Sequence, residues 1–89
     1  MARKNKEIDK KAKIRIKVKN LLAEIARVDA NLVKEETKIR EDLGVDSLTS
    51  VEILAAIEVR LGIMLDQAKA FDVVTVKDLI DLIISQSRP

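Results

Sequence analysis

Apolar residues recur at intervals of three and four along several stretches of the chain, which is the spacing of one face of an α-helix. The first stretch predicts a helix over residues 11–27. Its apolar stripe consists of Ile14, Val18, Leu21, Leu22, Ile25 and Val28. Residues 12–19 also alternate apolar and basic, as a half-buried strand would, and Ile16 lies off the helical stripe. Because the helical spacing continues well past the alternation, it favours a helix.

The clearest helical pattern runs from Ser47 to Leu61, where Gly62 ends it. We expect its inward face to comprise Val51, Leu54, Ile57 and Leu61, widened by Ile53. On this spacing Val51 belongs to the core more readily than to the surface.

Two further helices follow. Residues 66–71 have room for one short helical turn, and a last helix is expected over 76–85. Thr75 precedes it as a cap, with Asp78 three residues on, in a variant of the capping box. We expect Val76, Leu79, Ile80 and Ile83 to face inward, and Leu82 and Ile84 to be partly exposed.

Residues 29–46 form a long connection without a sustained period. A segment of this length is unusual in a small domain unless it is packed or functional. We therefore expect it to lie against the core through Leu32, Val33, Ile39 and Leu43. Gly44 can take a positive φ, and Asp46 or Ser47 can cap the next helix. Together the patterns predict an all-α fold, a small four-helix bundle of three longer helices and one short one, with a long packed loop between the first and second helices.

The residue inventory excludes several kinds of chemistry. The 89 residues include no His and no Cys, so zinc sites built from these residues, Ser-His-Asp and Cys-His catalysis and disulfides are ruled out. The longest apolar runs have five residues, whereas a membrane span needs about 20. The lack of cysteine and of a secretory signal favours a cytoplasmic protein.

Charge is divided unevenly along the chain. Residues 1–20 hold nine basic and two acidic residues, a balance of +7, whereas residues 21–89 hold eight basic and thirteen acidic, a balance of −5. We expect residues 1–11 to be a basic, disordered extension, residues 12–86 the folded domain, and residues 87–89 a tail. Phe71 is the only aromatic residue, so base stacking is not available and the sequence argues against nucleic acid as a partner. We expect a monomer.

Ser47 is the one position with candidate chemistry. It stands at a predicted helix start, where backbone N–H groups lack intrahelical partners and the helix dipole is positive, so a phosphate ester on its hydroxyl is favoured. As a nucleophile it lacks a base, because the chain has no His or Cys and no Lys near it in sequence. Taken alone, a serine after Asp46 is most simply a helix cap.

The residues around Ser47 change this assessment. The stretch from Glu41 to Ile53, EDLGVDSLTSVEI, closely resembles the phosphopantetheine-attachment motif of acyl carrier proteins. The likeness rests on Leu-Gly-x-Asp-Ser-Leu with Val51, Glu52 and Ile57 in phase behind it. It extends over residues 14–84 and includes FDVVTV at 71–76, which is similar to the approach to the last helix in polyketide-type carriers.

In that family a separate transferase moves 4′-phosphopantetheine from coenzyme A onto the serine, and the terminal thiol of the arm holds acyl groups as thioesters. The resemblance implies that Ser47 is the attachment point, that Asp46 assists the transferase through its metal ion, and that the chain is not an enzyme. Its partners would be a phosphopantetheinyl transferase and acyl-loading and acyl-transferring enzymes of fatty-acid, polyketide or specialised-lipid synthesis. The prosthetic group would supply the thiol that the sequence lacks.

Carriers of this kind present an acidic, partly apolar second helix to basic patches on their enzymes. By resemblance, the contact residues here are Leu48, Val51, Glu52, Ala55 and Glu58. Val59 and Arg60 stand where strongly acidic carriers continue their acidic run, and the segment 66–71 is also less acidic. With the basic extension, these departures favour a specialised carrier for polyketide or modified-lipid assembly.

The interior offers a candidate space for cargo. We expect its lining to be Ile53, Ile57, Leu61, Ile63, Val73, Val76, Ile80 and Ile83; a simply filled core fits the same residues equally well. The competing function is an unmodified carrier-like adaptor that binds proteins, or nucleic acid through its basic tail.

Overall fold

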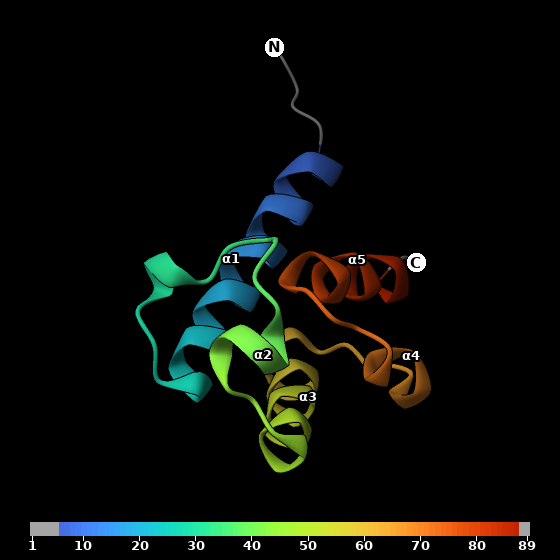
Figure 1. The fold of residues 1–89 in the computed structure, drawn as a ribbon. Helices are drawn as coiled ribbons and strands as arrows, with labels where there is room; N and C mark the ends of the chain where they lie inside the picture. The colour runs from blue at the N-terminus through green and yellow to red at the C-terminus, as the bar shows by residue number, and fades with distance from the viewer. Residues whose placement is uncertain (1–5, 88–89) are drawn as a thin grey trace.

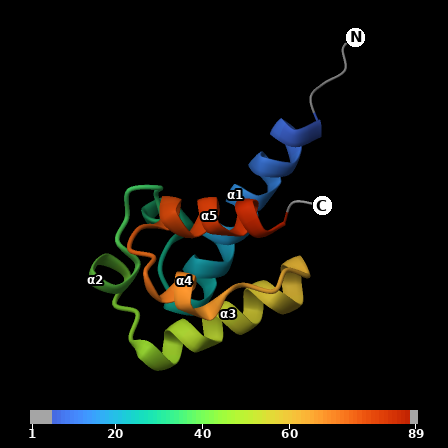
Figure 2. The same cartoon turned by 90° about the vertical axis from the view of Figure 1, so that its right-hand side faces the viewer.

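The long helix α1 (Lys6–Ala26) is the element against which the other long helices pack in the structure, a computed structural model that describes residues 6–87. The elements that follow are η1 (Ala30–Leu32), α2 (Ile39–Leu43), α3 (Ser47–Leu61), α4 (Gln67–Phe71) and α5 (Val76–Gln86). α3 and α5 both contact α1, and α4 contacts α5 (Figures 1 and 2). The described range contains no strand, so the all-α prediction is confirmed.

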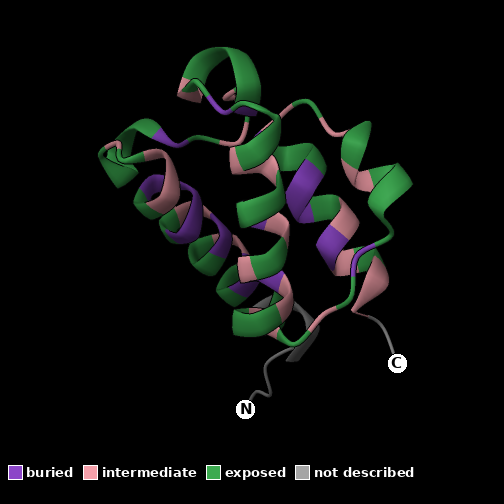
Figure 3. Ribbon diagram, turned by 90° about the horizontal axis from the view of Figure 1, so that it is seen from below, coloured by how far each residue is buried: buried purple, intermediate pink, exposed green. Residues whose placement is uncertain are grey.

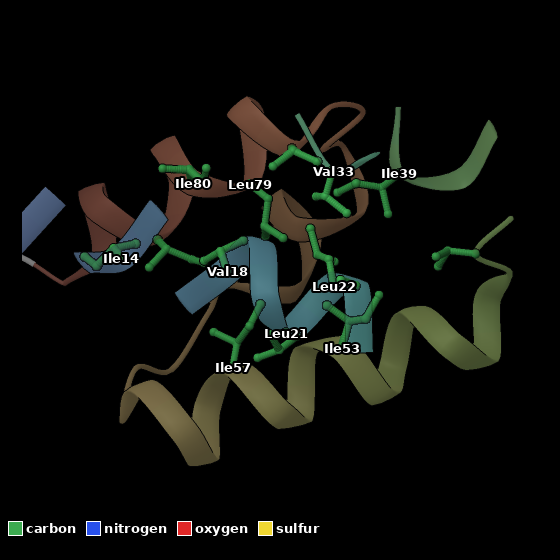
Figure 4. Packing of buried hydrophobic residues seen from close by; sticks show 14 of the residues in the cluster. Ile14, Val18, Leu21, Leu22, Val33, Ile39, Ile53, Ile57, Leu79 and Ile80 are labelled. Carbon is green, nitrogen blue, oxygen red and sulfur yellow. The ribbon is translucent and has the colours of Figure 1, made fainter. Parts of the chain in front are cut away.

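The core lies where α1, α3 and α5 meet. Ile53 and Ile57 of α3 point toward Leu21 and Leu22 of α1, and α5 approaches α1 from its other side (Figure 4). Buried positions form stripes on the facing sides of these helices (Figure 3). The buried apolar residues are Ile14, Val18, Leu21, Leu22, Ala23, Val33, Ile39, Val45, Ile53, Ile57, Leu65, Val76, Leu79, Ile80 and Ile83. Within the described range no polar or charged residue is buried.

The start of α1 differs from the prediction. The helix begins at Lys6 rather than near residue 11, so residues 6–11 of the expected disordered extension are helical. Residues 10–13 are all Lys or Ala, which are strong helix formers and can extend a helix without a buried face. Residues 1–5 lie outside the described range. Ile16 is exposed, as expected for a helix rather than for the alternative strand.

The connection between α1 and α3 is more ordered than a loop. It contains η1 and the single-turn helix α2, so residues 6–87 form five α-helices where four were predicted. One turn is too short to reveal a periodic pattern in sequence. The predicted packing is right for Val33 and Ile39 and wrong for Leu32, which is exposed. Val33 takes the buried position next to it.

Backbone hydrogen bonds attach this connection to the segment that precedes α5. Ile39 N–H donates to the carbonyl of Val74 at 2.9 Å, and Val76 N–H donates to the carbonyl of Thr37 at 2.9 Å. Lys38 and Thr75 form an isolated antiparallel bridge. Two segments far apart in sequence are therefore held side by side above the core.

The last helix agrees closely with the prediction. Thr75 caps α5 by accepting a hydrogen bond from Asp78 N–H at 3.1 Å, and the Asp78 carboxylate accepts from Thr75 N–H at 3.1 Å. The four residues expected to face inward are buried, and Leu82 and Ile84 are half-buried. Among the described helices, none combines the length and the apolar character needed to cross a membrane.

The core predicts the stability of two matched variants of α3. Ile57→Ala removes a fully buried side chain and should lower the free energy of unfolding by about 2 to 5 kcal/mol. Val59→Ala, on the exposed side of the same helix, should change it by less than about 0.5 kcal/mol. Urea unfolding followed by circular dichroism measures both. Equal losses would show that α3 does not pack as described.

Candidate functional site

Ser47 is exposed as the first residue of α3, and the three residues before it determine its position. Gly44 ends α2 in the left-handed conformation, with φ 68° and ψ 32°. Nothing lies within 4 Å of where a Cβ on Gly44 would stand, so the glycine is needed for its backbone angles and not for space. Val45 is buried, and it anchors the turn so that Asp46 and Ser47 emerge at the surface.

Asp46 caps α3. Its Oδ1 accepts a hydrogen bond from Thr49 N–H at 2.8 Å, and its backbone carbonyl accepts from Ser50 N–H at 2.9 Å. The hydrogen bond from the Thr49 backbone is the main cause that lowers the pKa of the Asp46 carboxyl. The carboxylate next to Ser47 is therefore ionised at neutral pH.

The geometry suits a serine that receives a group and does not suit a catalytic one. The adjacent carboxylate already accepts a hydrogen bond from the helix backbone, and the chain has no His or Cys to take the hydroxyl proton. The first N–H groups of α3 and its dipole favour a negative phosphate ester at this end. An exposed hydroxyl at such a helix start can be reached by the active site of another protein.

The outer face of α3 carries the residues predicted to contact partners. Leu48 is 72% exposed and Val51 56% exposed. Glu52 and Ala55 are also exposed, and Glu58 is half-buried. The assignment of Val51 to the core is wrong. It precedes buried Ile53 by two residues, about 200° around the helix, so only one of the two can face α1.

The far end of α3 is tied to α1 by an ion pair. Arg60 Nη1 and Nη2 donate to Glu24 Oε1 and Oε2 at 2.9 and 3.0 Å. The hydrogen bond from Arg60 lowers the pKa of Glu24. The charge of Arg60 is therefore paired with that of Glu24. The adjacent Val59 is exposed. The acidic residues of the outer face, Glu52 and Glu58, both precede this end of the helix.

A cavity of about 50 Å³ lies beside the first turns of α3, between α2, α4 and the start of α5. It is lined by Ile39, Arg40, Ser50, Val51, Ile53, Leu54, Ala70, Phe71, Val73 and Leu79. Ser50 follows Ser47 by three residues, so both lie on one side of the helix and the cavity lies one turn from the candidate attachment point.

The predicted cargo lining overlaps this cavity only at Ile53 and Val73. Ile57, Val76, Ile80 and Ile83 lie in the filled core instead, with at most 1% of their surface exposed. Leu61 and Ile63, near the other end of α3, do not line the cavity either.

Sequence reasoning missed most of the wall because it comes from four segments that meet only in the fold. Phe71 could have been predicted to line the cavity, since it is the only aromatic residue of the sequence and lies in a short segment with little else to bury it. The cavity is smaller than an engineered apolar cavity of about 150 Å³ that binds benzene. An acyl chain longer than a few carbons would have to widen it.

Comparison with known proteins identifies the family to which this arrangement belongs. A family model described as a phosphopantetheine attachment site matches residues 17–83. The chain belongs to the acyl carrier protein family. An acyl carrier protein of Campylobacter jejuni subsp. doylei is 38% identical over 66 residues, which cover 74% of this chain and 86% of that protein.

Two other acyl carrier proteins show similar agreement. One from Treponema denticola is 35% identical over 72 residues, covering 81% of this chain and 92% of the relative. One from Saccharopolyspora erythraea is 35% identical over 66 residues, which cover 74% of this chain and 70% of that protein. Acyl carrier proteins are carriers and not enzymes, they hold 4′-phosphopantetheine covalently, and they interact with phosphopantetheinyl transferases and biosynthetic enzymes.

The cap of α3 predicts a dependence of stability on pH. Because the pKa of Asp46 is lower in the folded protein, its contribution is fully present above its unfolded pKa, near 4, and is lost as pH falls through the lower folded value. Asp46→Asn keeps a side-chain acceptor without the titration. We expect this variant to lose less stability between pH 7 and pH 3 than the wild type, as measured by urea unfolding.

Asp46→Ala provides the matched control, since it removes the acceptor at every pH. It should be less stable than Asp46→Asn at pH 7 and should show a similarly weakened response to acid. If Asp46→Asn retained the full acid response of the wild type, the carboxylate of Asp46 would not be responsible for any part of it.

Proposed function

We propose that Ser47 is the attachment point of 4′-phosphopantetheine in this carrier and that the thiol of the arm holds acyl groups as thioesters. The observation that carries the proposal is the position of Ser47, an exposed hydroxyl on the first residue of α3 and inside the region matched by the family. The bound arm supplies the thiol, which no residue of the chain can provide.

The residues around Ser47 fit the phosphate of such an arm. Gly44 and the buried Val45 hold the turn, so that Ser47 meets a transferase in a fixed orientation. The N-terminal end of α3 offers backbone N–H groups and a positive dipole to the phosphodiester. Among the described residues none accepts a hydrogen bond from the Ser47 hydroxyl, and we assign the base to the transferase.

We propose that Asp46 assists this transfer by presenting its second oxygen to a cation held by the transferase. Thr49 N–H donates to Oδ1, and the Asp46 residue is exposed to solvent, where a partner can reach its carboxylate. The lowered pKa of Asp46 keeps the carboxylate charged for this purpose. Since the described residues contain no cluster of carboxylates able to hold a metal ion by itself, the ion would have to come with the partner.

The outer face of α3 from Leu48 to Glu58 is the surface that we propose for recognition by acyl-loading and acyl-transferring enzymes. Exposed Leu48 and Val51 offer apolar contact beside the candidate attachment point, and Glu52 and Glu58 add negative charge. Charges on such a surface act mainly on the rate of encounter with a basic partner. The exposed Val59 and the paired Arg60 at the far end support a specialised carrier for polyketide or modified-lipid assembly.

The cavity beside Ser50 is the place that we propose for the start of a bound acyl chain. Val51 and Phe71 lie at its rim, and both are more than half exposed, so they can move apart without breaking the core. Ile53 and Val73 belong to its wall. A chain entering here would pass between α3 and α4, away from the filled centre of the bundle.

Loading with coenzyme A tests the attachment point. The wild-type chain, incubated with a promiscuous phosphopantetheinyl transferase, should gain the mass of one phosphopantetheine group, and Ser47→Ala should gain none. Ser50→Ala, one turn along the same helix, should load as the wild type does. Intact-mass spectrometry reads all three. If the wild-type chain gains no mass under conditions in which a known carrier protein is loaded, the result favours the unmodified adaptor.

A charge reversal on α3 tests the recognition surface. Glu52→Lys should slow acyl loading by a cognate enzyme several-fold at low salt, with a smaller effect at high salt because the charges are then screened. Glu36→Lys makes the same change in net charge at an exposed position outside α3 and should have little effect. Stopped-flow or single-turnover experiments measure the rate of acyl loading of each variant at low and at high salt. Equal slowing by both variants would assign the effect to net charge alone.

A further inference from the structure

The outer side of α1 is a strongly basic surface that the carrier function does not use. From Lys10 to Ala23 the chain has six basic residues and no acidic one. Lys10, Lys13 and Lys17 are exposed and follow one another at spacings of three and four, so they lie along one side of the helix. We call the exposed residues Lys10, Lys13, Ile16 and Lys17 the α1 basic face.

An exposed isoleucine lies along one edge of this surface. Ile16 precedes the fully buried Val18 by two residues and therefore points about 200° away from the core side of α1. It is 60% exposed, with Lys13 one turn before it and Lys17 directly after it. A large apolar side chain flanked by lysines can enter an apolar layer while the ammonium groups remain in a polar one.

Two lysines of the α1 basic face, Lys13 and Lys17, have no ion-pair partner among the side chains of residues 10–87. Arg15, on the other side of the helix, is paired with Glu35 at 2.7 Å. Lysine is a compact point charge that adds to an overall field and does not form the planar fork by which arginine reads a single carboxylate or phosphate. The surface is therefore suited to a broad negative layer.

The α1 basic face is remote from the start of α3. The first turns of α1 extend beyond the body of the bundle, and the turn that leads into α3 lies at the opposite end of the molecule in both side views (Figures 1 and 2). The part of the chain that follows residue 20 has a balance of −5. A negative layer would attract α1 and repel the rest, so it would orient the molecule with Ser47 pointing away.

We propose that the α1 basic face docks the protein onto an anionic lipid surface, with Ile16 in the interfacial layer and the lysines at the headgroups. The helix would lie on the surface and not cross it. Ile16 favours lipid over duplex nucleic acid, which offers no apolar layer along its phosphates. A second copy is a poor occupant, since α1 of one copy against the acidic part of α3 of the other would cover Ser47.

This docking does not depend on the attachment of an arm at Ser47, so its failure and the failure of the proposed function are distinguishable. Each lysine near an anionic membrane strengthens binding about fivefold. Lys13 and Lys17 together then account for a factor of about 30. Docking would hold the carrier near a lipid layer and leave Ser47 exposed to the enzymes that act on the arm.

Flotation with phosphatidylcholine vesicles, with and without phosphatidylglycerol, tests the proposal on the full chain. The wild type should float with the anionic vesicles at low salt and detach from them at high salt. It should not bind the vesicles made of phosphatidylcholine alone. Lys13→Glu/Lys17→Glu should weaken binding to the anionic vesicles by at least about 30-fold. Ile16→Ser should weaken it several-fold. Ser47→Ala should bind as the wild type does.

Lys34→Glu/Lys69→Glu is the matched control, because it changes net charge equally at exposed positions outside α1. It should keep most of the binding, and circular dichroism should show that both double variants remain folded. The proposal is overturned if anionic vesicles are not bound at low salt, or if both double variants lose binding equally. It is also overturned if duplex DNA is bound more tightly than the vesicles and Ile16→Ser leaves vesicle binding unchanged.

Discussion

Ile53 and Ile57 set the rotation of α3 about its own axis, because they are its two buried side chains and both pack toward α1. Every other residue of the helix takes its direction from this contact. Leu48 and Val51 are left facing solvent, and Ser50 faces the cavity. The same contact therefore determines which residues of α3 belong to the recognition surface and which to the wall of the cavity, and Val51, at the rim, belongs to both.

The short helices α2 and α4 are held by their neighbours more than by their own hydrogen bonds. Each has five residues, which is well below the length at which an isolated helix is stable in water. α2 is held by buried Ile39, whose N–H reaches the carbonyl of Val74, and α4 is held by its contact with α5. Both form walls of the cavity, so this side of the bundle can widen while α1, α3 and α5 keep the core closed.

The sequence allowed local features to be predicted better than features assembled across the chain. The bounds of α3 and the cap of α5 were right because their signals, Gly62 and the Thr75–Asp78 pair, lie within a few residues of the helix ends they define. The start of α1 was missed because basic residues can be either a solvated tail or a helix. Val51 was misplaced because its spacing fits two faces, and only the contact with α1 decides between them.

The cavity shows why the site could be predicted only in part. Ser47 was identified from contiguous residues, whereas the wall beside it joins α2, α3, α4 and α5, whose proximity depends on the hydrogen bonds between residues 37–39 and 74–76. Charge adds a second kind of long-range organisation. Salt screens exposed charges beyond about 8 Å at physiological ionic strength. The first turns of α1 and the start of α3 lie at opposite ends of the molecule, so an anionic partner at α1 and a basic one at α3 would each act mainly on the charges nearest to it, and neither would block the other.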